Sequence, residues 1–306
     1  MNFPKLGLAI VAPGGCAPDG AQLERGIERL QQTSGSTIHN YYDHAKAFQR
    51  FGGTDRSRLE QLHAAARDPD AQVVMALRGQ YGISRVLDAI DFDLLADSGK
   101  IFVGYSDITA LHMGLYAKRG KISYAGPMFY GDFTGDELNP YTVSQFVDCL
   151  RGPTHTVQGE GARNPDVDVE GRVWGGNLSM FVHLAGTPWF PDIDGGILYF
   201  EDVNEHPYRI ERMLLQLLHM GVLQRQKALV LGAITAFKLA PSDNGYDFDV
   251  MLAYLRERLP IPVLTGLPFG HVPVRCTIPF GAPAHLVSRE GRFELTMRDY
   301  PTLDLA

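Results

Sequence analysis

The stretch Lys100-Ile-Phe-Val-Gly-Tyr-Ser-Asp-Ile-Thr-Ala-Leu-His-Met-Gly-Leu-Tyr116 joins a short apolar strand pattern to a helix pattern. The strand pattern stops at Gly104, and the helix pattern begins just after Ser106. A hydroxyl on such a turn is exposed at the edge of a sheet, beside free N–H groups at the start of a helix. The segment departs from the hydrolase elbow G-x-S-x-G, because Ile108 replaces the second glycine. Ser106 is therefore either a nucleophile or an ordinary helix N-cap.

Strand and helix patterns alternate through the first half of the chain. The expected strands are residues 6–12, 73–77 and 101–103, and the expected helices are residues 19–32, 58–66, 84–89 and the segment after 106. This alternation predicts a doubly wound, Rossmann-like α/β domain with a mostly parallel sheet, which we place at residues 1–138.

The pattern weakens over residues 139–168, where prolines interrupt it, and we expect a linker there. Residues 169–306 are expected to form a second domain, either mixed α/β or a small barrel-like sheet. Its expected strands are residues 171–174, 195–200, 228–234 and 262–265, and its expected helices are residues 210–219 and 248–258.

Three turns follow strands of the first half, at Ala12–Gly15, Arg78–Gly82 and Gly104–Ser106. Ligands bind beyond the carboxyl ends of parallel strands, so these turns are expected to meet at one site. The two Gly-rich turns among them, Ala12–Gly15 and Arg78–Gly82, do not match a nucleotide-binding motif. Gly79 would let its backbone approach a reacting carbonyl as an oxyanion donor. Arg78 is a candidate for binding a carboxylate, or it braces the turn.

Composition excludes several classes of function. The net charge of −7, from 28 basic and 35 acidic residues without a basic stripe, argues against nucleic acid as a partner. We find no signal peptide and no apolar run near the ~20 residues that cross a bilayer, so we expect a soluble, cytoplasmic protein without a membrane partner. Cys16, Cys149 and Cys276 do not suggest disulfides or a zinc site, and no H-E-x-x-H spacing suggests a catalytic metal.

A serine nucleophile needs a base and a group that orients the base, and the second half offers a candidate for each. Glu201 ends an apolar strand pattern, although it could belong to a solvated acidic loop. His271 follows a strand and a Gly- and Pro-rich loop, although it could be a loop histidine without a role. His206 is the rival base, and its Asn-Glu-His-Pro context is more typical of a structural loop residue.

Seven short motifs, taken together and in chain order, resemble the LD-carboxypeptidase family of serine peptidases. They are Arg78-Gly-x-Tyr-Gly82, Gly104-Tyr-Ser-Asp107, Gly126-Pro-Met128, Trp174-Gly-Gly-Asn-Leu178, Leu198-Tyr-Phe-Glu-Asp202, Glu211-Arg-Met-Leu214 and Thr265-Gly-Leu-Pro-Phe-Gly-His271. The block Glu201–Leu214 is especially similar to the muramoyl-tetrapeptide carboxypeptidases of peptidoglycan recycling.

The resemblance implies a catalytic triad with Ser106 as nucleophile, His271 as base and Glu201 as its orienter. It also implies release of the terminal D-Ala from a murein tetrapeptide, free or sugar-linked, at the bond between an L-centre of a diamino acid and D-Ala. A cytoplasmic homodimer without a cofactor, with a flavodoxin-like first domain, is expected. The related microcin-immunity peptidases, which cut acyl-sulfamoyl nucleotide conjugates, are one alternative, and a non-catalytic module that binds a small ligand is another.

One position departs from the family pattern. The family commonly has Arg-Gly-Gly-Tyr-Gly where this chain has Gln80. A positive φ at that position would strain a non-glycine residue, whereas a negative φ would let Gln80 supply its N–H without strain. We therefore expect the N–H groups of Gly79 and Asp107 to serve as the oxyanion donors, with Gln80 as an alternative.

Overall fold

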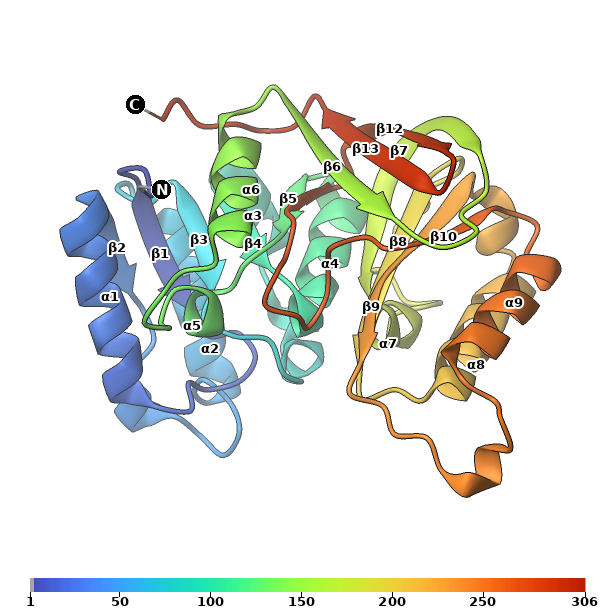
Figure 1. The fold of residues 1–306 in the computed structure, drawn as a ribbon. Helices are drawn as coiled ribbons and strands as arrows, with labels where there is room; N and C mark the ends of the chain where they lie inside the picture. Colours follow the sequence, from blue (N-terminus) through green and yellow to red (C-terminus); the bar gives the residue numbers. More distant parts are fainter. Residues whose placement is uncertain (1–2, 306) are drawn as a thin grey trace.

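The computed structural model describes residues 3–305 of the chain and contains two β-sheets with helices packed against them (Figure 1). The strands are β1 (Gly7–Val11), β2 (Thr37–Asn40), β3 (Val73–Ala76), β4 (Ile101–Gly104), β5 (Ser123–Ala125), β6 (Thr154–Glu160), β7 (Val167–Asn177), β8 (Ile197–Val203), β9 (Ala228–Thr235), β10 (Val263–Thr265), β11 (Ile278–Phe280), β12 (Pro283–Arg289) and β13 (Arg292–Arg298). The helices are α1 (Gly20–Ser34), α2 (Asp55–Arg67), α3 (Phe92–Asp97), α4 (Thr109–Arg119), α5 (Phe129–Asp132), α6 (Pro140–Arg151), α7 (Leu178–His183), α8 (Pro207–His219) and α9 (Phe248–Arg258).

The first sheet has the strand order β11-β5-β4-β3-β1-β2. Strands β1 to β5 are mutually parallel, and their order 2-1-3-4-5 is that of a flavodoxin-like sheet. The expected doubly wound fold is thus confirmed. In this fold the chain reverses direction across the sheet between β1 and β3, and ligands bind at the carboxyl ends of the strands there.

Alternation along the strands divides their side chains between two hydrophobic cores, because successive side chains of a strand point to opposite faces. In β1, Leu8 and Ile10 pack into the core that includes side chains of α1 and α6, whereas Ala9 and Val11 pack into the core of α2, α3 and α4. Both cores continue across the second sheet. The parallel strands are therefore buried on both faces, and the site lies beyond their ends.

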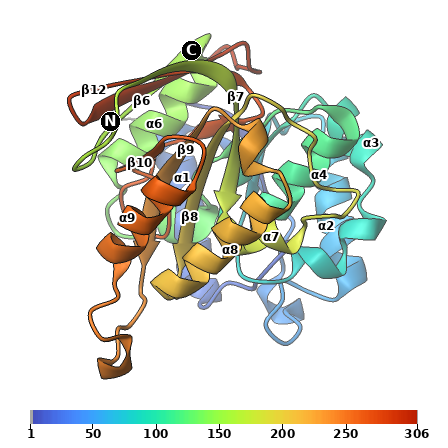
Figure 2. The same cartoon turned by 90° about the vertical axis from the view of Figure 1, so that its right-hand side faces the viewer.

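The second sheet has the order β10-β9-β8-β7-β12-β13-β6 and mixes parallel with antiparallel pairs. The long strand β7 pairs antiparallel with β12 along its first part and parallel with β8 along its second. Among residues 3–305, the edge strands β10 and β6 do not pair with each other. The second half is thus the mixed α/β structure that we expected, but its sheet is open and is not a closed barrel. Helices α7, α8 and α9 lie along one side of it (Figure 2).

The expected linker at residues 139–168 differs from the structure. Pro140 begins α6, and the Asn139 side chain caps this helix by accepting a hydrogen bond from Thr142 N at 3.1 Å. Proline is well tolerated at the first position of a helix, so here it marks a start and not an interruption. Strand β6 then joins the second sheet at its edge. The boundaries of the two domains remain predictions.

Two segments from the end of the chain return to the first half. Strand β11 pairs antiparallel with β5 and so extends the first sheet. The segment after β13 runs back over α6 (Figure 1), where Leu303 N donates to Leu150 O at 2.7 Å. These contacts connect the part of the chain that carries His271 to the sheet that carries Ser106.

Candidate active site

The three turns beyond β1, β3 and β4 meet as the sequence predicts. Gly15 N donates to Gly79 O at 2.8 Å, which joins the first two turns. Gly79 in turn lies against Ser106, since a β-carbon at position 79 would be 2.9 Å from Ser106 Oγ. Arg58 of α2, fully buried, donates to Pro13 O and, at 2.8 Å, to Gly82 O. The turns thus form one braced surface around the serine.

Ser106 occupies a sharp turn between β4 and α4. Its φ is +64°, in the left-handed region that non-glycine residues rarely adopt, and it opens the short 3-10 helix η4 (Ser106–Ile108) that leads into α4. Neither η4 nor α4 receives a side-chain cap from this serine. The helix N-cap interpretation is therefore wrong, and the Oγ is directed elsewhere.

His271 and Glu201 lie next to the serine hydroxyl. His271 Nε2 is 3.1 Å from Ser106 Oγ, and His271 Nδ1 is 2.7 Å from Glu201 Oε2. Since a carboxylate can only accept, Nδ1 carries the proton and Nε2 is free to accept the serine proton. Glu201 is 0 % exposed, so it is not part of a solvated loop. The structure brings together the three residues that the sequence separates by up to 165 positions.

Asn177, at the end of β7, fixes the other oxygen of Glu201. Its Nδ2 donates to Glu201 Oε1 and to Asp202 Oδ1, each at 3.1 Å. Asp202 also accepts hydrogen bonds from Ser179 N and Oγ. Burial raises the pKa of Asp202, and Glu201 adds to this effect. The Trp174–Asn177 segment therefore ends β7, and its last residue orients the carboxylate.

Two N–H groups beside Ser106 are free to bind an oxyanion. Among the described residues, neither Gly79 N nor Asp107 N donates a hydrogen bond. The Asp107 side chain accepts from Ile83 N at 2.8 Å and is 2 % exposed. Burial raises the pKa of this carboxyl group to about 7, although hydrogen bonds from the Ile83 and Gly82 N–H groups and the charge of Arg58 oppose the shift. Asp107 thus connects the serine turn to the Arg78–Gly82 turn.

An activated hydroxyl, a base and N–H donors at one point are the components of acyl transfer through a covalent intermediate. Family models for LD-carboxypeptidases match the chain over both halves, the N-terminal domain at residues 8–126 and the C-terminal domain at residues 170–286. The chain belongs to the LD-carboxypeptidase family. It is therefore an enzyme of the serine-type carboxypeptidase class.

Similar proteins cover nearly all of this LD-carboxypeptidase. A solved muramoyltetrapeptide carboxypeptidase from Oxalobacter formigenes is 51% identical, with a TM-score of 0.92 over 97% of this chain and 100% of that one. A probable murein peptide carboxypeptidase of Bacillus subtilis is 28% identical over 92% of this chain and 89% of its own. The microcin C7 self-immunity protein of Escherichia coli is 28% identical over 84% of this chain and 83% of its own.

Gln80, where this LD-carboxypeptidase departs from the family pattern, has a φ of +64°. Of the two backbone conformations considered for Gln80, the structure thus adopts the positive φ, which strains a non-glycine residue. The Gln80 side chain lies over Gly15, because a β-carbon on that glycine would be 2.6 Å from Gln80 Oε1. Arg78, half-buried in the same turn, has one long hydrogen bond of 3.4 Å from its Nη1 to Cys16 O, so it braces the turn only weakly.

His206, the rival base, has other partners. His206 caps α8 by accepting from Tyr208 N, and its Nε2 lies 3.1 Å from Asp243 Oδ2 on a loop of the second half. Cys276 is fully buried, and this burial raises the pKa of its thiol, which disfavours the nucleophilic thiolate. Sequence reasoning assigned no role to Asn177, Tyr105 or Arg275, which contact the catalytic candidates or their backbone. The quoted motifs include Asn177 and Tyr105, whereas Arg275 lies in none of them.

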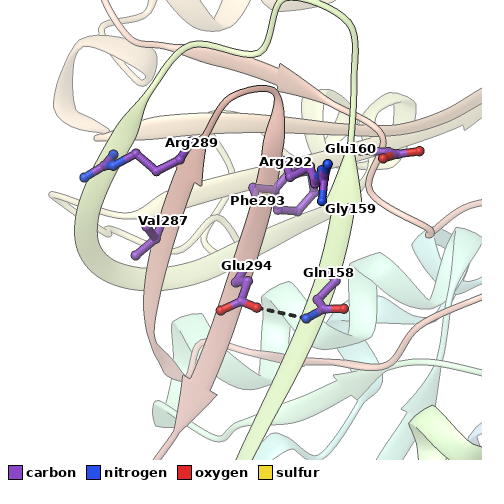
Figure 3. A pocket seen from close by; sticks show the side chains of 8 residues that line it. All are labelled: Gln158, Gly159, Glu160, Val287, Arg289, Arg292, Phe293 and Glu294. Atoms are coloured by element: carbon purple, nitrogen blue, oxygen red, sulfur yellow. Dashed lines mark hydrogen bonds between the residues drawn. The ribbon is translucent and has the colours of Figure 1, made fainter.

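One pocket of this LD-carboxypeptidase lies away from Ser106. It has a volume of about 590 Å³ and is lined by residues of β6, β12 and β13 (Figure 3). Gln158 donates to Glu294 Oε1 across it at 2.8 Å. Its lining residues include none of the candidate catalytic groups.

Over residues 3–305, no helix is long and apolar enough to cross a membrane.

Proposed function

We propose that this chain is a serine LD-carboxypeptidase that releases the terminal D-Ala from murein tetrapeptide. The bond cut joins the L-centre of a diamino acid to D-Ala. The observation that carries this proposal is the hydrogen-bonded chain from Ser106 Oγ through His271 to the buried Glu201. The substrate is supported by the similarity to the Oxalobacter formigenes enzyme over nearly the whole chain.

In the first step, Ser106 Oγ attacks the carbonyl carbon of the diamino acid while His271 Nε2 takes the hydroxyl proton. Glu201 orients the imidazole and stabilises its positive charge. The C–N bond then breaks, and His271 gives the proton to the amine of D-Ala, which leaves. Water repeats the cycle on the acyl-enzyme, with His271 again as base, and releases the tripeptide acid.

The N–H groups of Gly79 and Asp107 would hold the negative oxygen that develops in both steps. Neither group donates to another acceptor within residues 3–305, and Gly79 lies against the nucleophile. Removing one such donor typically raises a barrier by about 2.7 to 4 kcal/mol. Fixed donors of this kind avoid the cost of reorienting water during the reaction.

Arg78 would bind the free carboxylate of the terminal D-Ala. Its guanidinium makes one weak contact to Cys16 O and is otherwise without an acceptor among the described residues. Arginine binds a carboxylate through two parallel hydrogen bonds, and this geometry would select a peptide that ends at the leaving residue. Arg78→Lys should therefore raise KM more than it lowers kcat.

We further propose that the enzyme acts in peptidoglycan recycling, in the cytoplasm and as a homodimer. A tetrapeptide that carries D-Ala, free or still linked to its sugar, is the substrate that such recycling would supply. Fractionation of cells and light scattering of the purified protein test the location and the oligomeric state.

The deciding experiment is incubation of the protein with L-Ala-γ-D-Glu-meso-diaminopimelate-D-Ala, with release of D-Ala measured for wild type and Ser106→Ala. We expect release by wild type only, unchanged by a chelator, since no step uses a metal. No release by wild type would contradict the substrate, and equal release by both proteins would contradict the site. Loss of activity on chelation would favour a metallo-carboxypeptidase.

Similarity to the microcin C7 self-immunity protein supports a second candidate, a peptidase that cuts acyl-sulfamoyl nucleotide conjugates. The same two proteins incubated with glutamyl-sulfamoyl adenosine distinguish the two activities. We expect faster turnover of the tetrapeptide. A folded protein that binds either compound without turnover would be a small-ligand-binding module and not an enzyme.

A further inference from the structure

His271 lies on a segment that has no helix or strand to hold it. Strand β10 ends at Thr265 and β11 begins at Ile278, and the structure assigns no regular element between them. A base must stay within hydrogen-bond reach of its nucleophile, and a shift of about 1 Å can cost on the order of 10²-fold in rate. The position of His271 therefore requires support from other residues.

Arg275, on the same segment and 2 % exposed, supplies that support on both sides of the histidine. Its Nε donates to Gly270 O at 3.0 Å, and its Nη2 donates to Val272 O at 2.9 Å. These two carbonyls belong to the residues immediately before and after His271. One planar guanidinium thus fixes the backbone at both neighbours of the base.

The same guanidinium is anchored to the first half of the molecule. Its Nη1 lies 2.7 Å and 2.8 Å from the two carboxylate oxygens of Asp132, which ends α5. Asp132 also accepts a hydrogen bond from Met128 N at 2.8 Å, so its carboxylate is itself held in place. A fixed carboxylate holds the rigid, planar set of N–H donors of an arginine in one orientation. The ammonium group of a lysine has no such planar set of donors.

Arg275 also contacts the residue that precedes the nucleophile. Its Cζ lies 3.8 Å from the centre of the Tyr105 ring, in the geometry of a cation–π interaction. The Tyr105 ring packs edge-on against the His271 ring, with the ring centres 5.1 Å apart. Tyr105 is therefore packed between the arginine and the base, next to Ser106 in the chain.

From these contacts we infer that Arg275, anchored by Asp132, is a positioning residue for His271. It holds the base loop against the turn of the nucleophile, so that His271 Nε2 stays at the serine hydroxyl. The hydrogen bonds of the Arg275 guanidinium go to Gly270 O, Val272 O and Asp132, and within residues 3–305 none goes to the side chains of Ser106, His271 or Glu201. This inference rests on the proposed role of Ser106 and His271 as nucleophile and base.

The test compares wild type with Arg275→Lys and Asp132→Asn. Lysine keeps the charge but loses the planar set of donors that reaches Gly270 O, Val272 O and Asp132 together. For Arg275→Lys we expect kcat for D-Ala release to fall on the order of 10²-fold, with KM within about 3-fold, because a shifted base slows the chemical step and not substrate binding. Asp132→Asn should reproduce part of this loss.

A second measurement does not depend on the tetrapeptide. A fluorophosphonate probe labels an activated serine: the Ser106 Oγ–P bond forms, the P–F bond breaks, and His271 takes the proton. We expect the labelling rate of Arg275→Lys to fall in proportion to kcat. For Arg275→Ala, added guanidinium ion at millimolar concentration should restore part of the labelling rate.

Arg256→Lys is the matched control. Arg256 also donates to backbone carbonyls, from Nε to Val263 O at 3.1 Å and from Nη1 to Ala162 O at 3.3 Å, but it does not contact the segment of His271. We expect its kcat and labelling rate to equal those of wild type. Thermal unfolding of each variant shows that the assays are made on folded protein.

The outcomes separate the two proposals. If wild type is labelled at Ser106 but releases no D-Ala, the substrate is wrong and the labelling rates alone decide the role of Arg275. The inference would be overturned if folded Arg275→Lys had the same labelling rate and kcat as wild type. It would also be overturned if Arg256→Lys lost as much kcat and labelling rate as Arg275→Lys. Absence of labelling and of turnover in wild type would overturn the catalytic site and the positioning role together.

Discussion

Gly79 and Ser106 are in direct contact, and no side chain fits between them: a β-carbon at position 79 would be 2.7 Å from Ser106 Cβ and 2.9 Å from its Oγ. Gly79→Ala must therefore displace the nucleophile or the turn that carries the proposed oxyanion donor. We expect kcat to fall on the order of 10²-fold, since small displacements at a reacting centre have effects of this size. The kinetics of D-Ala release by Gly79→Ala and wild type measure this loss of kcat.

Gly135→Ala is the control for this substitution. The nearest heavy atom to a β-carbon at position 135 is Glu137 O at 3.5 Å, an ordinary contact. Its kcat should match that of wild type. Equal kcat values for Gly79→Ala and wild type would show that the turn tolerates a side chain and that close packing against Ser106 has no role in the reaction.

Glu201 and Asp202 are adjacent buried carboxylates that share the Asn177 amide, but only Glu201 bonds to His271. Glu201→Gln should lower kcat by on the order of 10³- to 10⁴-fold, because the amide neither fixes the productive tautomer of the imidazole nor stabilises its charge. The pH dependence of kcat and kcat/KM, measured for both proteins, checks this expectation.

Asp202→Asn tests whether the effect belongs to Glu201 alone. Burial already disfavours the charge of Asp202, as its raised pKa indicates, so its neutral substitute should leave kcat within about 5-fold of wild type. Its hydrogen bonds from Ser179 would be weakened, so some loss of thermal stability is expected. Comparable losses of kcat in both variants would assign the effect to the whole carboxylate cluster.

The sequence predicts the mostly parallel, doubly wound sheet and the meeting of its turns because both follow from local patterns. Apolar runs ended by glycine mark the buried parallel strands, and the carboxyl ends of such strands lie at one edge. Ser106, Glu201 and His271 each belong to a short motif, and their order along the chain directed attention to them. Their mutual distances depend on how the two sheets pack, which no local pattern specifies.

Other features were not predictable because they depend on contacts between distant segments. Arg275 meets Asp132 across 143 positions of the chain, and nothing in either segment indicates the other. The prolines around residue 140 suggest an interruption when the sequence is taken alone, whereas the Asn139 cap makes Pro140 a helix start. The β12–β13 hairpin turns at Glu290 and Gly291, both with positive φ, and a glutamate at such a turn is a weak signal.

Gln80 is strained by its left-handed backbone, and Gln80→Gly should relieve that strain. A non-glycine residue with a φ of +64° costs about 1 to 2 kcal/mol, while glycine adds about 0.5 to 1 kcal/mol of backbone entropy loss on folding. We expect the free energy of unfolding to rise by a few tenths to about 1 kcal/mol. Denaturant unfolding at constant pH measures it.

Gln80→Val should increase the backbone strain at this position, whereas Gln80→Gly should relieve it. A β-branched side chain is least compatible with a positive φ, so this variant should be less stable than wild type. The expected order of stability is Gly, then Gln, then Val at position 80. A Gln80 protein more stable than Gln80→Gly would mean that contacts of the Gln80 side chain over Gly15 outweigh the backbone strain.

Asp107 should make stability depend on pH in a direction opposite to that of most carboxylates. Burial raises its pKa from 3.8 to about 7, so the folded protein holds a proton that the unfolded chain has lost between these pH values. Its contribution therefore lowers the free energy of unfolding as pH rises from about 4 to about 7, by at most about 4 kcal/mol. Asp107→Asn keeps an oxygen for Ile83 N and cannot ionise, so the stability of this variant relative to wild type should increase over that range. For the partly buried Asp243, hydrogen bonds from Ala240 N and His206 lower the pKa below 3.8, so the stability of Asp243→Asn relative to wild type should fall as pH rises towards about 4 and stay constant above it. Urea unfolding of the three proteins from about pH 2 to pH 8 measures both trends, and a flat difference for Asp107→Asn between pH 4 and pH 7 would show that its carboxyl group titrates as in the unfolded chain.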